Sequence, residues 1–182
     1  KYGIGLLTKQ VPLRLQAIPL PGREEARTLI LAEFEDYIYC CTHLSLTEED
    51  RMKSLEIVKS STASYKKPLF LAGDMNAEPE SDFIKELQKD FQILSNPKQS
   101  TYPASEPQKT IDYITTLKSN INGFALISAQ VLNEPMASDH RPILVEIRTA
   151  EKADKIFRTK PYLQNPVGNG ITVMWETTVP AY

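Results

Sequence analysis

The chain has 182 residues, of which 41% are hydrophobic and 24% charged, as is typical of one well-cored globular domain with a short appendage. Its 21 basic and 23 acidic side chains give a net charge of −2, so no strong overall field attracts nucleic acid or an anionic membrane, although a local patch is compatible with this balance. No apolar stretch approaches the ~20 residues that a membrane-spanning helix needs.

The front of the chain is dominated by patterns typical of strands. Residues 4–7 form a short apolar run, and Leu15 and Ala17 belong to an alternating pattern that predicts a half-buried strand with these side chains inside. Two further β-rich runs, 28–34 and 37–42, are separated by two acidic residues. This arrangement predicts a hairpin.

Two helices are expected in the middle of the chain. The first starts at Thr47, because Thr47-Glu48-Glu49-Asp50 resembles a capping box, and its apolar stripe of Met52, Leu55 and Val58 predicts core packing. The second helix is shorter and starts at Ser81. Its inward-facing residues are expected to be Phe83, Ile84 and Leu87.

The apolar run before residue 74 predicts a buried strand between these two helices, and further β-like runs lie at 111–114, 124–132 and 143–147. Residues 96–108 are rich in Pro, Ser and Lys and predict a loop. The composition changes at Arg148. We expect a first domain over 1–148, a charged linker or solvated helix over 149–160, and the start of a second module over 161–182.

Polar side chains gather where several of these strands end. Asp74 and Asn76 lie two apart, so they point to the same side if the strand geometry continues. A carboxylate beside a carboxamide suits work on water, a hard cation or a phosphoryl oxygen, but Gly-Asp-x-Asn is equally typical of a plain turn. Loops at one edge of an α/β sheet form a common crevice, which favours a site. The expected participants are His43, Asp74, Asn76, Asp112, Asp139 and His140.

Other chemistries fit the sequence less well. Ser138-Asp139-His140 contains the residue types of a hydrolase triad, but consecutive residues cannot form that relay. Zinc sites need closely spaced His or Cys ligands, which two distant histidines and one vicinal cysteine pair do not supply. No Gly-rich phosphate loop is present. The Asp and Asn oxygens favour ions such as Mg²⁺.

Four motifs in the same order resemble the endonuclease/exonuclease/phosphatase superfamily. They are Thr42-His43-Leu44, Gly73-Asp74-Met75-Asn76, Ile111-Asp112-Tyr113-Ile114 and Ser138-Asp139-His140. Tyr2 to Leu7 is similar to that family's central strand, so the resemblance extends over residues 1–148. It implies an α/β fold, a two-layered β-sandwich flanked by helices. This is the deoxyribonuclease-like four-layer α/β sandwich with its N-terminal part missing.

The resemblance implies metal-assisted attack of water on a phosphoester. His140 would be the general base or would stabilise the phosphate, and Asp112 would hold it. Asp74 would orient or deprotonate the water and bind the metal, while Asn76 would donate a hydrogen bond to a phosphoryl oxygen. His43 would support the phosphoryl oxygens or the leaving group.

Asp139 would lie at the metal or in its water shell. The implied metal is Mg²⁺, with Mn²⁺ or Ca²⁺ as alternatives. The implied substrate is a phosphorylated small molecule, a phospholipid headgroup or a nucleic acid. The family's upstream Asn and its metal-binding Glu have no counterpart in these 182 residues. We therefore expect these residues alone to be inactive, and the parent protein that contains them to be an active hydrolase. A non-catalytic binding or scaffold domain and a nuclease remain alternatives.

The tail resembles a second family. Pro161-Tyr162-Leu163-Gln164, followed by Ile171-Thr172-Val173-Met174-Trp175, is similar to the start of the fibronectin-type-III-like domain that precedes purple-acid-phosphatase-type metallophosphoesterases. This resemblance implies a metallophosphoesterase domain downstream and an extracytoplasmic location, secreted or periplasmic. A generic strand of an accessory β domain is the alternative.

Overall fold

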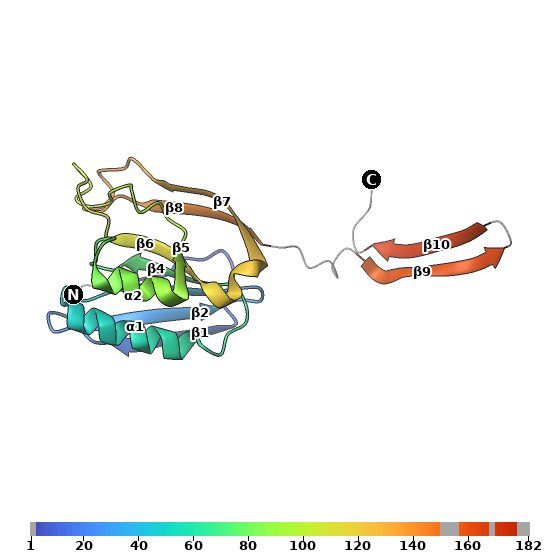
Figure 1. Ribbon diagram of the computed structural model, residues 1–182, viewed down its shortest axis with the longest axis horizontal. Coiled ribbons are helices and arrows are strands. Elements are labelled where there is room, and N and C mark those ends of the chain that lie inside the picture. Colours follow the sequence, from blue (N-terminus) through green and yellow to red (C-terminus); the bar gives the residue numbers. More distant parts are fainter. Residues whose placement is uncertain (1–2, 150–156, 168–169, 178–182) are drawn as a thin grey trace. The chain divides into compact units, whose positions relative to one another are not determined.

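The computed structural model describes residues 3–149, 157–167 and 170–177. The chain forms two compact units, Lys1–Arg148 and Thr149–Tyr182. In the second unit, the described residues form one antiparallel strand pair, β9 (Phe157–Val167) with β10 (Gly170–Thr177) (Figure 1).

The first unit is built on a six-stranded sheet whose strand order is β1-β2-β3-β4-β6-β5 (Figure 1). Its strands are β1 (Arg14–Leu20), β2 (Arg27–Glu33), β3 (Ile38–His43), β4 (Leu69–Asp74), β5 (Phe91–Ile93) and β6 (Asp112–Leu117). Neighbouring strands pair antiparallel except for β3 and β4, which are parallel. A parallel pair requires a crossover connection, and α1 (Glu48–Thr62) lies within it.

The two α-helices, α1 and α2 (Asp82–Asp90), lie together over one face of this sheet, and a short 3-10 helix, η1 (Lys118–Gly123), follows β6 (Figure 1). The main hydrophobic core fills the space between the helices and the sheet. Alternate residues of each strand point into it, as the two-residue period of a strand requires. Its buried members include Leu29, Leu31, Cys40, Leu69 and Leu71 from the sheet and Leu55, Val58, Phe83, Ile84 and Leu87 from the helices.

The opposite face of the sheet carries a second β layer. It consists of β7 (Phe124–Val131) and β8 (Ile143–Thr149), which pair with each other. The ring of Phe124 meets that of Phe70 edge-on at a centroid distance of 5.0 Å. Phe70 is the strand neighbour of two helix-facing leucines, so this contact lies on the other side of the sheet. The α/β fold class expected from the sequence, two β layers with helices outside, is confirmed.

The first two strands predicted at the front of the chain differ from the expectation. Residues 4–7 form no strand. The strand predicted around Leu15 is present as β1, but Ile18 and Leu20 face the core, whereas Leu15 is 62% exposed and Ala17 is exposed too. Both faces of β1 carry apolar side chains, so alternation could not decide which face the helices cover.

The two predicted helix starts have different outcomes. The Ser81 hydroxyl accepts a hydrogen bond from the Ile84 amide at 3.3 Å, so the predicted N-cap of α2 is confirmed. Thr47 is the N-cap residue of α1, but its side chain makes no capping bond, and the predicted capping box is wrong. The Thr47 hydroxyl instead donates to Glu24, which lies on the loop between β1 and β2.

Most of the linker expected over 149–160 lies outside the described residues, and its last four residues already belong to β9. Within the part of the chain that is described, no helix is long and apolar enough to cross a membrane.

The cap of α2 offers a simple test of this fold. Ser81→Ala should lower the free energy of unfolding by ~1 kcal/mol, because it removes the hydroxyl that accepts the Ile84 amide. Urea unfolding followed by circular dichroism measures the change. Ser60→Ala, on the exposed surface of α1, should have little effect. Equal losses in the two variants would contradict the assigned cap.

Candidate functional site

The register of three neighbouring strands places three polar side chains next to one another. His43 at the end of β3 pairs with Asp74 at the end of β4, and Asp74 pairs with Asp112 at the start of β6. Paired residues of neighbouring strands project from the same face. The His43 Nε2 atom lies 3.4 Å from Asp74 Oδ2. Backbone pairing alone therefore places an imidazole and two carboxylates next to one another at the ends of three inner strands.

The last residues of β4 and the turn that follows it have unusual backbone angles. Gly73 has φ 143°, and a Cβ atom there would lie 1.8 Å from the carbonyl oxygen of Thr42, so this position requires glycine. Asn76 has φ 48°, a left-handed conformation that asparagine tolerates better than most residues. Its backbone amide donates to Asp74 Oδ1 at 2.8 Å. The condition for placing Asp74 and Asn76 on the same side, a strand that continues to Asn76, is therefore not met, because β4 ends at Asp74.

The side chain of Asn76 ties this turn to the end of β3. Its Nδ2 donates to the carbonyl oxygen of Leu44, the residue after His43, at 2.9 Å. The backbone amide of Leu44 in turn donates to the carbonyl oxygen of Asp74, also at 2.9 Å. One N–H of the Asn76 amide is thus used inside the protein. Donation of the other N–H to a phosphoryl oxygen, which the family resemblance implies, stays a prediction.

His140 reaches the same place from the loop before β8. Its Nδ1 atom lies 2.8 Å from Asp112 Oδ2, so the two side chains that the resemblance pairs are in contact. Its Nε2 atom lies 3.9 Å from Asp74 Oδ2, which is too long for a hydrogen bond. The imidazole is therefore held by one carboxylate and turned toward the other.

Thr101 is a participant that sequence reasoning missed. It is fully buried, and its hydroxyl donates to the Asp112 oxygen that also contacts His140, at 2.6 Å. Its backbone carbonyl accepts from the amide of Arg141 at 2.8 Å, directly after His140. The next residue is Tyr102, whose ring centroid lies 4.8 Å from that of His140. The Thr-Tyr pair inside a Pro-, Ser- and Lys-rich loop was the available signal.

The charges at the site shift two pKa values upward. Partial burial raises the pKa of Asp74, and the neighbouring Asp112 charge adds to this, while the Asn76 amide and both histidines oppose it. Burial lowers the pKa of His140, but the hydrogen bond and charge of Asp112, with Asp74 and Asp139, outweigh burial and raise it overall. Both groups are therefore easier to protonate than in an open peptide.

The donor set fits a divalent cation. Asp74, Asp112 and His140 offer two carboxylate oxygens and a ring nitrogen that all lie within 4.8 Å of one another. Carboxylate oxygens are the ligands preferred by hard cations, and imidazole is accepted by several transition metals. Asp139 lies outside this group. Its side chain is exposed and receives the Ser138 hydroxyl at 3.2 Å, so its role as a metal ligand stays a prediction.

A cavity of about 380 Å³ adjoins these groups, on the face of the sheet opposite the helices. Its lining includes Asp112, His140 and Arg141, and also Cys41 on β3 and Ala72 on β4. This space gives a small molecule access to the Asp112–His140 pair.

A model of the endonuclease/exonuclease/phosphatase family matches residues 1–140. The chain belongs to this family. Comparison with curated protein sequences finds no match.

Several solved structures share the fold of the chain. They include the endonuclease/exonuclease/phosphatase from Bacteroides vulgatus (17% identity, TM-score 0.63, 76% of this chain), the Bacteroides thetaiotaomicron mannosyl-6-phosphatase Bt3783 (16%, 0.61, 75%) and the human Nocturnin catalytic domain (20%, 0.55, 76%). The matches cover 66%, 66% and 60% of those chains, respectively, so this chain spans less than two thirds of their lengths.

The raised pKa of His140 can be tested directly. In Asp112→Asn, a neutral amide replaces the carboxylate that stabilises the imidazolium, so the pKa of His140 should fall below its value in the unsubstituted chain. Proton NMR titration in the presence of a chelator measures it. Asp82→Asn, on the exposed start of α2, is the control and should leave this titration unchanged. An unchanged or higher pKa in Asp112→Asn would rule out the assigned cause.

The buried hydroxyl of Thr101 should matter for stability. Thr101→Val keeps the side-chain shape but removes the donor to Asp112, and should lower the free energy of unfolding by about 1.5–3 kcal/mol, the usual range for a hydrogen bond to a charged group. Thr101→Ser keeps the hydroxyl and should lose less. Urea denaturation compares the two variants, and equal losses would mean that the hydroxyl contributes nothing.

Proposed function

We propose that this chain carries the site of a phosphoester hydrolase in which water attacks phosphorus with help from Asp74, His140 and Asn76. The arrangement of His140 between two carboxylates, 2.8 Å from Asp112 and 3.9 Å from Asp74, is the observation that supports it most. An acid–base group fixed at one nitrogen and open at the other is what proton transfer from water needs.

The proton path follows from this geometry. Because Asp112 contacts Nδ1, that nitrogen carries the proton and Nε2 keeps its lone pair. Nε2 faces Asp74 across a gap wider than a hydrogen bond, so one water molecule could contact both groups. His140 or Asp74 accepts the proton of that water, and because the pKa of each group is raised, each would hold the accepted proton more strongly than an unperturbed side chain.

The remaining residues hold the phosphoryl group. The second N–H of the Asn76 amide donates to one phosphoryl oxygen, and His43, which lies 3.4 Å from Asp74, supports the other oxygens or the leaving group. We propose Mg²⁺ as the cation, held by Asp74 with Asp112 or Asp139. When bound, it would neutralise charge on the phosphoryl oxygens.

The substrate is proposed at the level of its chemistry. The mannosyl-6-phosphatase among the similar structures supports a phosphorylated small molecule, and the cavity beside His140 has room for one. The net charge of −2 disfavours tight binding of nucleic acid, so a nuclease is the second choice.

The end of the chain is part of the same proposal. We propose that β9 and β10 begin a fibronectin-type-III-like domain, that a metallophosphoesterase domain follows, and that the protein works outside the cytoplasm. The alternating pattern of Ile171 to Trp175 in the sequence, and the antiparallel β9–β10 pair in the structure, are compatible with such a β domain.

Hydrolysis of bis(p-nitrophenyl) phosphate and p-nitrophenyl phosphate by the full-length protein tests this function. We expect release of nitrophenol with Mg²⁺, loss of it with EDTA, and a ~10²–10³-fold lower kcat in Asp74→Asn or Asn76→Ala, which remove transition-state contacts. Asp82→Asn, which alters an exposed carboxylate on α2, should retain full activity.

Two results would overturn the proposal. One is an inert protein across phosphate monoesters, diesters and phospholipid headgroups, which would favour the scaffold alternative. The other is activity that persists undiminished in Asp74→Asn, which would place the chemistry elsewhere.

A further inference from the structure

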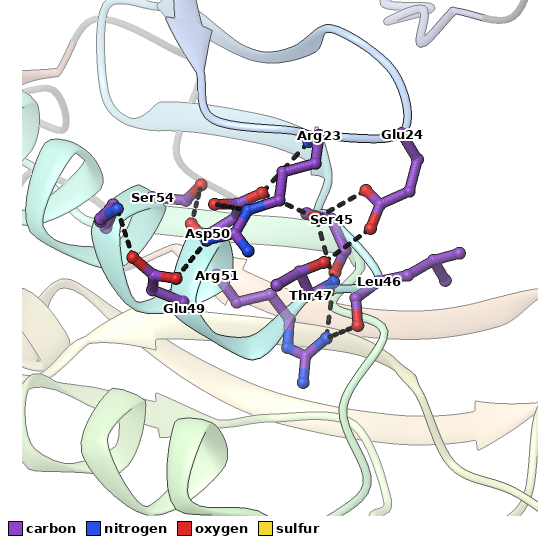
Figure 2. Close-up of polar contacts among 10 residues, drawn as sticks. Arg23, Glu24, Ser45, Leu46, Thr47, Glu49, Asp50, Arg51 and Ser54 are labelled. Atoms are coloured by element: carbon purple, nitrogen blue, oxygen red, sulfur yellow. Dashed lines mark hydrogen bonds and ion pairs between the residues drawn. The ribbon is translucent and has the colours of Figure 1, made fainter.

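The loop between β1 and β2 contacts the loop between β3 and α1 through Glu24 (Figure 2). One oxygen of the Glu24 carboxylate accepts the Ser45 hydroxyl at 2.8 Å, and the other accepts the Thr47 hydroxyl at 2.7 Å. The Thr47 and Ser45 hydroxyls lower the pKa of Glu24 to about 2. The carboxylate is therefore ionised at every pH at which the protein would be assayed.

Residues at the start of α1 form hydrogen bonds to both of these loops. Arg51 on α1 is buried, and its Nη1 donates to the carbonyl oxygens of Ser45 at 3.0 Å and Leu46 at 2.7 Å (Figure 2). The backbone amide of Arg23 donates to Asp50 Oδ2 on the first turn of α1 at 3.1 Å. The loop between β3 and α1 is thus fixed between one helix and the neighbouring hairpin loop.

This arrangement replaces a local helix cap. The Thr47 hydroxyl occupies the N-cap position of α1, where such a side chain commonly accepts a backbone amide of the first turn. Here it donates to Glu24 across 23 residues of sequence instead. The α1 helix therefore has no side-chain cap from Thr47, and the loop before the helix is hydrogen-bonded to the loop between β1 and β2.

The fixed loop leads directly to the candidate site. Leu44 stands between Ser45 and His43, and its backbone makes both hydrogen bonds that connect β3 to the turn after β4. Its amide donates to Asp74 and its carbonyl accepts from the Asn76 side chain, each at 2.9 Å. A displacement of Ser45 therefore moves the acceptor that orients Asn76.

We propose that Glu24 is a positioning residue for this site. By binding the Ser45 and Thr47 hydroxyls it fixes the backbone of Leu44, and through Leu44 it sets the orientation of the Asn76 amide and of His43. Its effect on catalysis rests on the proposed phosphoester hydrolysis, whereas its effect on orientation does not.

The orientation is tested by NMR on the chain without substrate or metal. In Glu24→Ala, the side-chain amide signals of Asn76 and the ring signals of His43 should shift, and the Asn76 amide protons should exchange faster with water. Glu24→Gln can still accept one hydroxyl and should restore most of the original spectrum. Glu48→Ala, which removes an exposed carboxylate beside the same loop, is the matched control and should leave both residues unchanged.

A second variant covers the case in which Glu24→Ala fails to fold. Thr47→Val removes one of the two hydroxyls with little change of shape, and should shift the Asn76 and His43 signals in the same direction by a smaller amount. If Glu24→Ala and Thr47→Val leave the signals of Asn76 unchanged, as the control Glu48→Ala does, Glu24 does not position the site.

Kinetics separate this inference from the proposed function. In the full-length protein, Glu24→Ala should lower kcat by about 10- to 100-fold with little change in KM, because a misplaced donor acts on the transition state more than on binding. Glu24→Gln should recover most of the rate, and Glu48→Ala should match the unsubstituted protein. If the unsubstituted protein hydrolyses no phosphoester, the proposed function fails while the NMR result still decides the role of Glu24. If it is active and Glu24→Ala retains its kcat, the positioning role fails alone.

Discussion

The pairing of β3, β4 and β6 is the constraint on which the site depends. Backbone register alone places His43, Asp74 and Asp112 side by side on three neighbouring strands. Two carboxylates directly opposite each other on paired strands repel, and partial burial of Asp74 increases the cost. Such an arrangement persists only if other groups compensate for it, so the surrounding loops must bring donors to these two side chains.

The loops supply those donors in a definite pattern. Asp74 receives the backbone amide of Asn76, and Asp112 receives the Thr101 hydroxyl and contacts the His140 ring. Each donor comes from a segment with no regular secondary structure of its own, held by further hydrogen bonds. The sheet provides the two carboxylates, and the loops provide the hydrogen-bond donors that stabilise them. The groups that could act on a phosphoester are therefore also those that stabilise this end of the sheet.

The sequence predicted the parts of this site that depend on local pattern. Motifs at strand ends identified Asp74, Asp112 and His140, because a strand that stops in polar residues is visible in one window. Thr101 and Glu24 were missed because their partners lie 11 to 23 residues away across loops, where no periodicity connects them. The buried face of β1 was wrong for a related reason, since both of its faces are apolar and only the helices decide between them.

The turn after β4 shows why a conformational and a functional interpretation of Gly-Asp-x-Asn need not compete. Gly73 allows β4 to approach β3 closely, and the left-handed backbone of Asn76 lets its amide bind the Asp74 carboxylate. That same backbone conformation directs the Asn76 side chain to Leu44 rather than along the strand. A straight strand would place Asp74 and Asn76 on one face but leave Asn76 unconnected to β3. The turn is therefore what joins the carboxylate, the carboxamide and the loop after His43 into one structural unit.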